Sequence, residues 1–158
     1  KRQIQNQCLK IFVEQQPAAS DLRRVSSALK MITDLERIGD NARDIAEICM
    51  GLPDDCDTTS LPLIKEMAEA TVNLLNRSID SFVNLDLELA KKIDDEDDLV
   101  DNYFLMIRDQ LIDIIKADFD PGAAIDFIMI AKYLERISDH GVNIADWVIF
   151  TVEGSRPE

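Results

Sequence analysis

The sequence is poor in the residues that interrupt helices and in aromatic residues. Its 158 residues include only five glycines and five prolines, and aromatic residues make up 6%. Apolar residues nevertheless account for 46%, so the composition excludes an intrinsically disordered chain. Few helix breakers, together with many Leu, Ile, Ala, Glu, Asp and Lys, favour long helices over a sheet, and we expect an all-α protein.

Cysteine and histidine are also scarce, which argues against several kinds of site. The three cysteines, Cys8, Cys49 and Cys56, form no CxxC pair, and His140 is the only histidine. A zinc site of Cys and His is therefore not expected, and reduced thiols in the cytosol fit this pattern best. The sequence has no G-x-x-x-x-G-K-[ST] loop for nucleotide hydrolysis, and one histidine gives no persuasive nucleophile–His–acid set. We therefore predict that the chain is not an enzyme.

Long hydrophobic runs and excess positive charge are missing too. No apolar run approaches the roughly 18 residues of a membrane span, and no signal-peptide pattern opens the chain, so we expect a cytoplasmic protein without membrane insertion. The formal net charge is -14 and the pI about 4.4. Such a surface repels phosphate backbones, which argues against nucleic-acid binding. Basic protein surfaces and hard cations are its natural counterparts, although acidity that only keeps the protein soluble is the simpler alternative.

Apolar residues recur at helical spacing along five segments. We predict helices over residues 1–15, from 20 or 21 to 50, 61–84, 87–117 and 123–151. Ser20 or Asp21 is expected to cap the second helix, Ser60 the third and Asp86 the fourth. Residues 52–60, rich in Pro, Asp and Thr, form the expected linker. Helices of this length predict antiparallel bundles joined by short loops.

The chain contains two copies of one unit. LERIGDNARDIAE at residues 35–47 and LERISDHGVNIAD at residues 134–146 agree at most positions. Two complete predicted helices precede the second copy, whereas only the segment 1–15 precedes the first. By this symmetry we expect that one helix and the front half of the next are missing from a six-helix protein. Residues 1–52 would then be the C-terminal part of a first three-helix bundle, and residues 60–153 a second one.

Each copy places acidic side chains on one helical face. Glu36 and Asp40 are four residues apart, as are Glu135 and Asp139, and Asp44 continues the first stripe. Like charges at this spacing destabilise an isolated helix by a few tenths, roughly 0.2–0.5 kcal/mol, so a positive group is expected nearby.

Two sources of positive charge remain open. Arg37, Arg43, Lys132 or Arg136 can form salt bridges with these carboxylates, which needs no metal. Alternatively, a divalent or trivalent cation is held by the carboxylate oxygens.

Four stretches of the sequence together resemble the PhoU family. They are LERIGD at residues 35–40, its echo LERISD at 134–139, QPAASDLR at 16–23 and HGVNIADWVIF at 140–150. The resemblance covers essentially the whole chain, and the two LERIxD motifs in order make it specific. It implies an all-α fold built as a tandem repeat of three-helix bundles.

The resemblance also implies a function. PhoU-like proteins are cytoplasmic negative regulators of phosphate uptake and of the phosphate-starvation response. The implied partners are the ATPase subunit of the phosphate ABC transporter and the phosphate-sensing histidine kinase, and many members are homodimers. Some members bind iron, zinc, manganese or magnesium through E(D)xxxD motifs. The expected metal ligands include the four motif carboxylates, Glu36, Asp40, Glu135 and Asp139. Asp44, one turn after Asp40, and a further DxxxD pair, Asp97 and Asp101, complete the expected set.

Two other functions are weighed against this one. One is a helical adaptor that recognises basic partner surfaces through its acidic face without any metal, which is close to the PhoU-like function. A ferritin-like di-iron carboxylate enzyme would need ExxH motifs on two helices. His140 lies five residues after Glu135, so the di-iron pattern fails.

Overall fold

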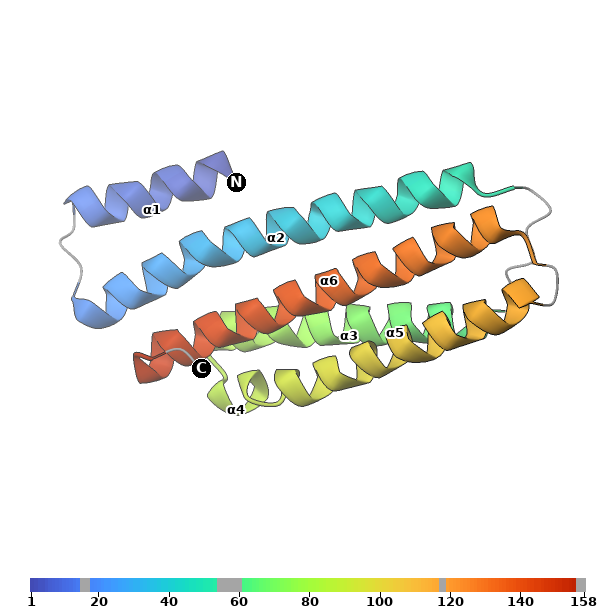
Figure 1. The fold of residues 1–158 in the computed structure, drawn as a ribbon. Coiled ribbons are helices and arrows are strands. Elements are labelled where there is room, and N and C mark those ends of the chain that lie inside the picture. Colours follow the sequence, from blue (N-terminus) through green and yellow to red (C-terminus); the bar gives the residue numbers. More distant parts are fainter. Residues whose placement is uncertain (15–17, 54–60, 117–118, 156–158) are drawn as a thin grey trace.

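The computed structural model of the chain describes residues 1–14, 18–53, 61–116 and 119–155 (Figure 1). In chain order its helices are α1 (Arg2–Glu14), α2 (Ala19–Gly51), α3 (Pro62–Asn84), α4 (Leu87–Ala90), α5 (Ile93–Lys116) and α6 (Pro121–Glu153). The described residues contain no strand, and the predicted all-α class is confirmed. Within these ranges, no helix is both long and apolar enough to span a lipid bilayer.

Helix α6 lies at the centre of the arrangement. It packs against α2 on one side and against α3 and α5 on the other, while the short α4 contacts both α3 and α6 (Figure 1). Helices α2 and α6 have 33 residues each and run antiparallel along most of their length. Helix α1 lies on α2. The division of the chain near residues 52–60 stays a prediction, because residues 54–60 lie outside the described ranges.

The apolar stripes of the helices meet in three buried clusters. One joins α3, α5 and the first half of α6 around Met67, Ile107 and Phe127. A second joins α3, α4, α5 and the end of α6. The third lies between α2 and α6 and contains Ile38 and Ile137, the equivalent isoleucines of the two repeats. The repeat therefore meets itself at the centre of the molecule, where each fully buried aliphatic side chain stabilises the fold by about 1.5–3 kcal/mol.

Small residues let α3 and α6 approach closely. Gly141 is buried in α6, and a Cβ at this position would overlap Leu74 Cδ2 and lie 3.5 Å from Ser78 Oγ. The buried hydroxyls of α3 are satisfied within their own helix, since Thr71 donates to the Met67 carbonyl and Ser78 to the Leu74 carbonyl, both at 2.9 Å. No polar partner from α6 is needed, and the two helices can pack through apolar surface.

The predicted helix over residues 87–117 is wrong in its first turns. Asp86 caps a helix as expected and accepts a hydrogen bond from the Leu89 amide at 3.0 Å. However, α4 ends at Ala90, the chain turns at Lys91 and Lys92, and α5 begins at Ile93. The break moves the acidic residues 94–96 into the first turn of α5, where negative charge faces the positive end of the helix dipole. Lys91 secures the turn by donating to Glu153 at 2.7 Å.

Other helix ends also differ from the prediction. Ala18, not Ser20 or Asp21, is the N-cap residue of α2, and it offers no side-chain hydrogen bond. Asp21 lies in the first turn instead, where it favours the dipole. Helix α6 begins at Pro121, two residues early, because Asp120 accepts from the Ala123 amide at 2.8 Å. Gly154, with φ 85°, ends α6 as a left-handed cap. The predicted cap Ser60 lies outside the described residues.

Candidate functional site on the α5–α6 surface

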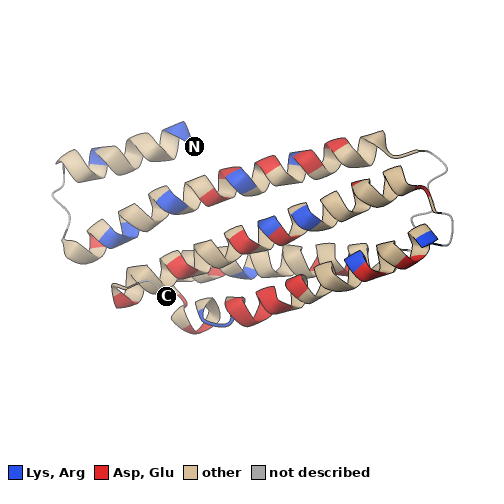
Figure 2. Ribbon diagram, in the orientation of Figure 1, with Lys and Arg blue, Asp and Glu red and all other residues tan. Residues whose placement is uncertain are grey.

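Four predicted site residues come together between α5 and α6. Asp97 and Asp101 lie one turn apart on α5, and Glu135 and Asp139 lie one turn apart on α6; we call them the acidic quartet. The packing of α5 on α6 sets the two pairs opposite each other, so that Asp101 interacts with both Glu135 and Asp139, and Asp97 with Asp139. Figure 2 shows the run of acidic residues in the first turns of α5 beside the acidic positions of α6.

Asp97 is the most perturbed member of the quartet. Its carboxyl group is half-buried, and burial is the main cause of a pKa raised from 3.8 to about 6. The negative charges of Asp101, Asp139 and Asp94 contribute to this rise, while the buried hydroxyl of Ser138 beside it acts in the opposite direction. Ser138 occupies the position of Gly39 in the first repeat, so this hydroxyl exists only in the second copy. The protein therefore holds Asp97 close to its neutral form at mildly acidic pH.

Asp101 and Asp139 show the same direction of change. Desolvation is the main cause that raises the pKa of each carboxyl, and the negative charge of Glu135 is the second. Lys132 opposes the rise at both residues, and His140 and Arg136 oppose it at Asp139. Desolvation and repulsion by neighbouring carboxylates together therefore outweigh the effect of the nearby basic groups on these pKa values.

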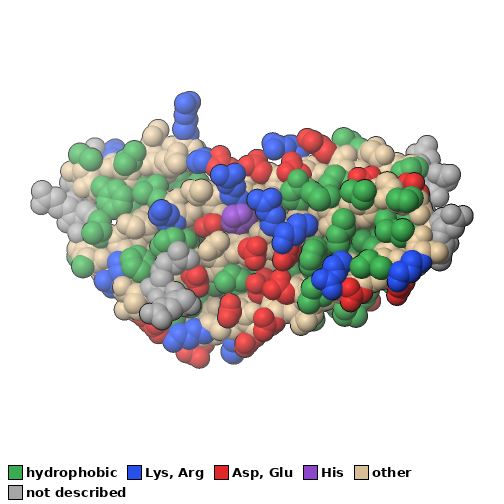
Figure 3. Space-filling view, in the orientation of Figure 1, with side chains coloured by type: hydrophobic (Ala, Val, Ile, Leu, Met, Phe, Trp, Pro, Cys, Tyr) green, Lys and Arg blue, Asp and Glu red, His purple; other side chains and the backbone are tan. Residues whose placement is uncertain are grey.

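Lys132 is the basic side chain in closest contact with the quartet. Its ammonium group forms an ion pair with Glu135, whose side chain is only 17% exposed, and it also lies 5.3 Å from the ring centroid of Phe104. Cation–π contact and the ion pair hold the ammonium group on the Glu135 side of the site. Figure 3 shows acidic side chains gathered in the middle of this face beside basic ones, with hydrophobic side chains toward the end at which α6 begins.

The first repeat places its predicted ligands differently. Glu36 pairs with Lys1, which lowers the pKa of the Glu36 carboxyl. Asp40 and Asp44 lie 3.4 Å and 3.8 Å from Arg43, and the same guanidinium reaches Glu47 at 3.7 Å. The carboxylates of the first repeat thus have basic partners on or beside α2, whereas those of the second repeat chiefly face other carboxylates.

The salt-bridge alternative therefore describes the first repeat better than the second. The ion pairs that Arg43 forms lie within α2, not between helices, and its side chain is exposed. Solvent-exposed pairs of this kind contribute about 0.3–0.5 kcal/mol each. The single charge of Arg43 offsets part of the negative charge of the stripe without holding helices together.

The donor chemistry of the quartet suits a hard cation, because carboxylate oxygens are the preferred ligands of Mg²⁺, Mn²⁺ and Ca²⁺. The side-chain positions are not those of a formed site. Among the described residues, no three His, Cys, Asp or Glu side chains are arranged as ligands of one metal ion. Cation binding would therefore require these carboxylates to change rotamer.

One contact near the quartet is not apparent from the motif spacing. His140 Nδ1 lies 3.1 Å from Asp34 Oδ1, and this half-buried pair joins α6 to α2. The residue equivalent to His140 in the first repeat is Asn41, which is buried. In the sequence, His140 stands within the second motif and Asp34 directly before the first. Their separation of 106 residues gives no reason to expect a contact between them.

Taken together, the fold and the site define an all-helical bundle protein with a duplicated acidic helix and a carboxylate-rich surface. A model of the PhoU domain matches residues 1–49 and 64–148. The chain belongs to the PhoU family.

Known proteins of this family match the chain over nearly its full length. A phosphate-specific transport system accessory protein PhoU homolog from Burkholderia sp is 34% identical over 96% of the chain. The crystal structure of PhoU from Pseudomonas aeruginosa has a TM-score of 0.88, with 32% identity, and covers 98% of this chain and 75% of that one. PhoU from Streptococcus pneumoniae shares the fold, with a TM-score of 0.88 at 23% identity over 96% of this chain and 72% of that one. The chain spans about two thirds of the length of the curated relatives, at 66% of the Burkholderia protein.

Proposed function

We propose that the chain is a negative regulator of phosphate uptake and of phosphate-starvation signalling that acts by protein contact. The partners in this proposal are the ATPase subunit of the phosphate ABC transporter and the phosphate-sensing histidine kinase, both met in the cytoplasm. The observation that carries it is the family match over both repeats, whose curated relatives are named accessory proteins of phosphate-specific transport. A net charge of -14 supports partners with basic surfaces.

In this proposal the chain acts without catalysing a reaction. Long packed helices present fixed side chains on their outer faces, which suits recognition of another protein surface. The relatives named above are accessory proteins, and their names assign them no reaction. Homodimer formation belongs to the same proposal and would give each complex two copies of the acidic surface.

Cation binding is the second candidate function, and the acidic quartet favours it. Burial and mutual repulsion raise the pKa values of Asp97, Asp101 and Asp139, and a bound cation would offset both effects. The residues that would hold the ion are Asp97, Asp101, Glu135 and Asp139. Glu36, Asp40 and Asp44 are weaker candidates because Lys1 and Arg43 already accompany them.

Co-purification from phosphate-replete cells tests the main proposal. The tagged chain should bring down the transporter ATPase and the histidine kinase, identified by mass spectrometry, and cells lacking the gene should express starvation genes in high phosphate. A tagged helical protein of similar charge is the control. Absence of both partners, together with normal repression in the deletion strain, would contradict the proposal.

A chelation arm separates the metal-dependent form of this function from the metal-free adaptor. ATPase binding is measured with and without EDTA, using protein purified without a histidine tag. Loss of binding with EDTA that returns on adding Mn²⁺ or Mg²⁺ supports a role for the cation. Binding that is unchanged by EDTA supports the metal-free adaptor.

A further inference from the structure

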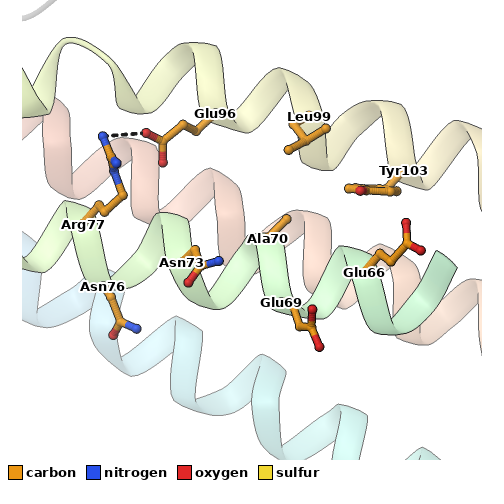
Figure 4. A pocket seen from close by; sticks show the side chains of 9 residues that line it. All are labelled: Glu66, Glu69, Ala70, Asn73, Asn76, Arg77, Glu96, Leu99 and Tyr103. Atoms are coloured by element: carbon orange, nitrogen blue, oxygen red, sulfur yellow. Dashed lines mark ion pairs between the residues drawn. The ribbon is translucent and has the colours of Figure 1, made fainter. Parts of the chain in front are cut away.

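A groove of about 630 Å³ lies between α3 and α5, away from the acidic quartet (Figure 4). From α5 it is lined by Glu96, Leu99 and Tyr103, which recur at helical spacing and share one face. Asp97 and Asp101 lie roughly 100° to 140° around the helix from Glu96. The groove and the quartet are therefore separate surfaces on the two sides of α5.

An ion pair closes one end of the groove. Arg77 on α3 lies 2.9 Å from Glu96 on α5, so this pair also links the two helices. Glu66 and Glu69 lie toward the other end, and Glu69 has a distant, exposed partner in Lys65 at 3.8 Å. Glutamates outnumber the single arginine among the lining residues, and that arginine is already engaged. The excess negative charge of the groove therefore lies at the end that holds Glu66 and Glu69.

The middle of the groove is apolar. Leu99 is 50% exposed, and the Tyr103 ring and Ala70 lie near it (Figure 4). Asn73 and Asn76 add amide groups on α3, which can both donate and accept hydrogen bonds. An apolar and aromatic centre with an acidic rim suits an arginine or lysine side chain, because its methylene stem packs on the apolar atoms while its charge reaches the carboxylates.

We propose that the α3–α5 groove receives a basic segment of the partner protein, with arginine or lysine at Glu66 and Glu69 and an apolar side chain on Leu99 and Tyr103. The inference rests on the proposed function, in which the partner is the transporter ATPase. The charge of the groove favours this occupant, because a basic side chain complements the two glutamates whereas a phosphate group or an anionic lipid surface is repelled. The groove adds a docking surface that is independent of the repeat motifs.

A peptide experiment tests the chemistry of the groove without the ATPase. The probe is a fluorescein-labelled amphipathic peptide with arginine and leucine on one helical face, and binding to the full chain is measured by fluorescence anisotropy. Glu66→Gln with Glu69→Gln should weaken binding about tenfold, since two favourable charge contacts are lost. The control, Asp109→Asn with Asp113→Asn, removes the same charge from exposed positions of α5 outside the groove and should change binding less than about twofold. Equal weakening in both variants, or none in either, would overturn the assignment.

Photo-crosslinking to the ATPase tests the biological occupant. The crosslinking amino acid p-benzoylphenylalanine replaces either Leu99 in the groove or Ile112, which is 47% exposed on α5 outside it. A crosslink to a basic segment of the ATPase from Leu99 alone supports the inference. A crosslink from Ile112 alone, with intact ATPase binding, would overturn the groove and leave the proposed function standing. Lack of ATPase binding by the wild-type chain would instead reject that function, and the peptide experiment would still decide whether the groove accepts basic segments.

Discussion

Individual carboxylates differ between the two repeats in the charges that surround them. Glu36 and Asp40 have basic neighbours, whereas Asp97 and Asp139 face further carboxylates and are partly shielded from water. The same motif thus gives carboxylates with basic partners in one copy and carboxylates that repel one another in the other. Single-residue experiments can measure this difference directly.

Asp97 should make stability depend on pH. Its folded-state pKa of about 6 lies above the ordinary 3.8, so the folded protein binds this proton more tightly, and stability falls as pH rises from about 4 to 6. At pH 7.5, Asp97→Asn should raise the free energy of unfolding by about 1 kcal/mol after allowance for solvent screening. The gain should shrink as pH falls and vanish below about pH 4. Urea unfolding at several pH values measures it, and the exposed Asp109→Asn is the control; a gain independent of pH would contradict this.

Gly141 and Gly39 should respond oppositely to alanine. Space around Gly39 is open, with nothing within 4 Å of a Cβ, so Gly39→Ala should stabilise by about 0.5–1 kcal/mol through helix propensity. At Gly141 the new Cβ meets buried Leu74, and Gly141→Ala should destabilise by about 1–3 kcal/mol. Thermal and urea unfolding measure both. If both variants gained stability, α3 and α6 would not be as closely packed as described.

Helix ends offer a prediction at the scale of the elements. Asp120 caps α6 through the Ala123 amide at 2.8 Å, so Asp120→Ala should lower the free energy of unfolding by about 1 kcal/mol. Asp21 only lies in the first turn of α2, and Asp21→Ala should cost about 0.3–0.5 kcal/mol. Urea unfolding compares the two; equal losses would show that the α6 cap contributes no more than the dipole does.

The helices could be predicted from sequence because their apolar periodicity is strong and because Pro and Gly stand near most of their ends. The break at Lys91 and Lys92 could not be predicted, since lysine is a good helix former and the burial of Ala90 and Ile93 on either side of the break depends on tertiary packing. The start of α2 was missed for a related reason. Two good capping residues follow Ala18, but the backbone enters the helix before reaching them.

The candidate site was predicted in its members more than in its arrangement. Spacing within a helix places Asp97 with Asp101, and Glu135 with Asp139. Spacing does not predict that the two pairs face each other, because this depends on how α5 packs on α6. Nor does it predict which carboxylates form ion pairs with Arg43. The His140–Asp34 contact and the α3–α5 groove depend on packing in the same way.

For the whole molecule, cation binding should appear as added stability. If the quartet binds Mn²⁺, the metal at about 100 times its Kd should raise Tm by roughly 5–10 °C, corresponding to about 2.7 kcal/mol. Glu135→Ala with Asp139→Ala should abolish that rise and lower metal content while leaving helicity unchanged. Glu36→Ala with Asp40→Ala is the matched control and should keep the rise. Calorimetry and metal analysis decide, and an unchanged metal content in the first variant would exclude these residues as main ligands.

The central position of α6 also has a practical consequence for spectroscopy. The only tryptophan of the chain, Trp147, lies in this helix, half-buried and edge-on to Phe150 with 5.9 Å between the ring centroids. Its emission should therefore follow movements of the helix that contacts α2, α3, α4 and α5. Docking of a partner without tryptophan on either side of the bundle can then be followed in unlabelled protein through the emission of Trp147.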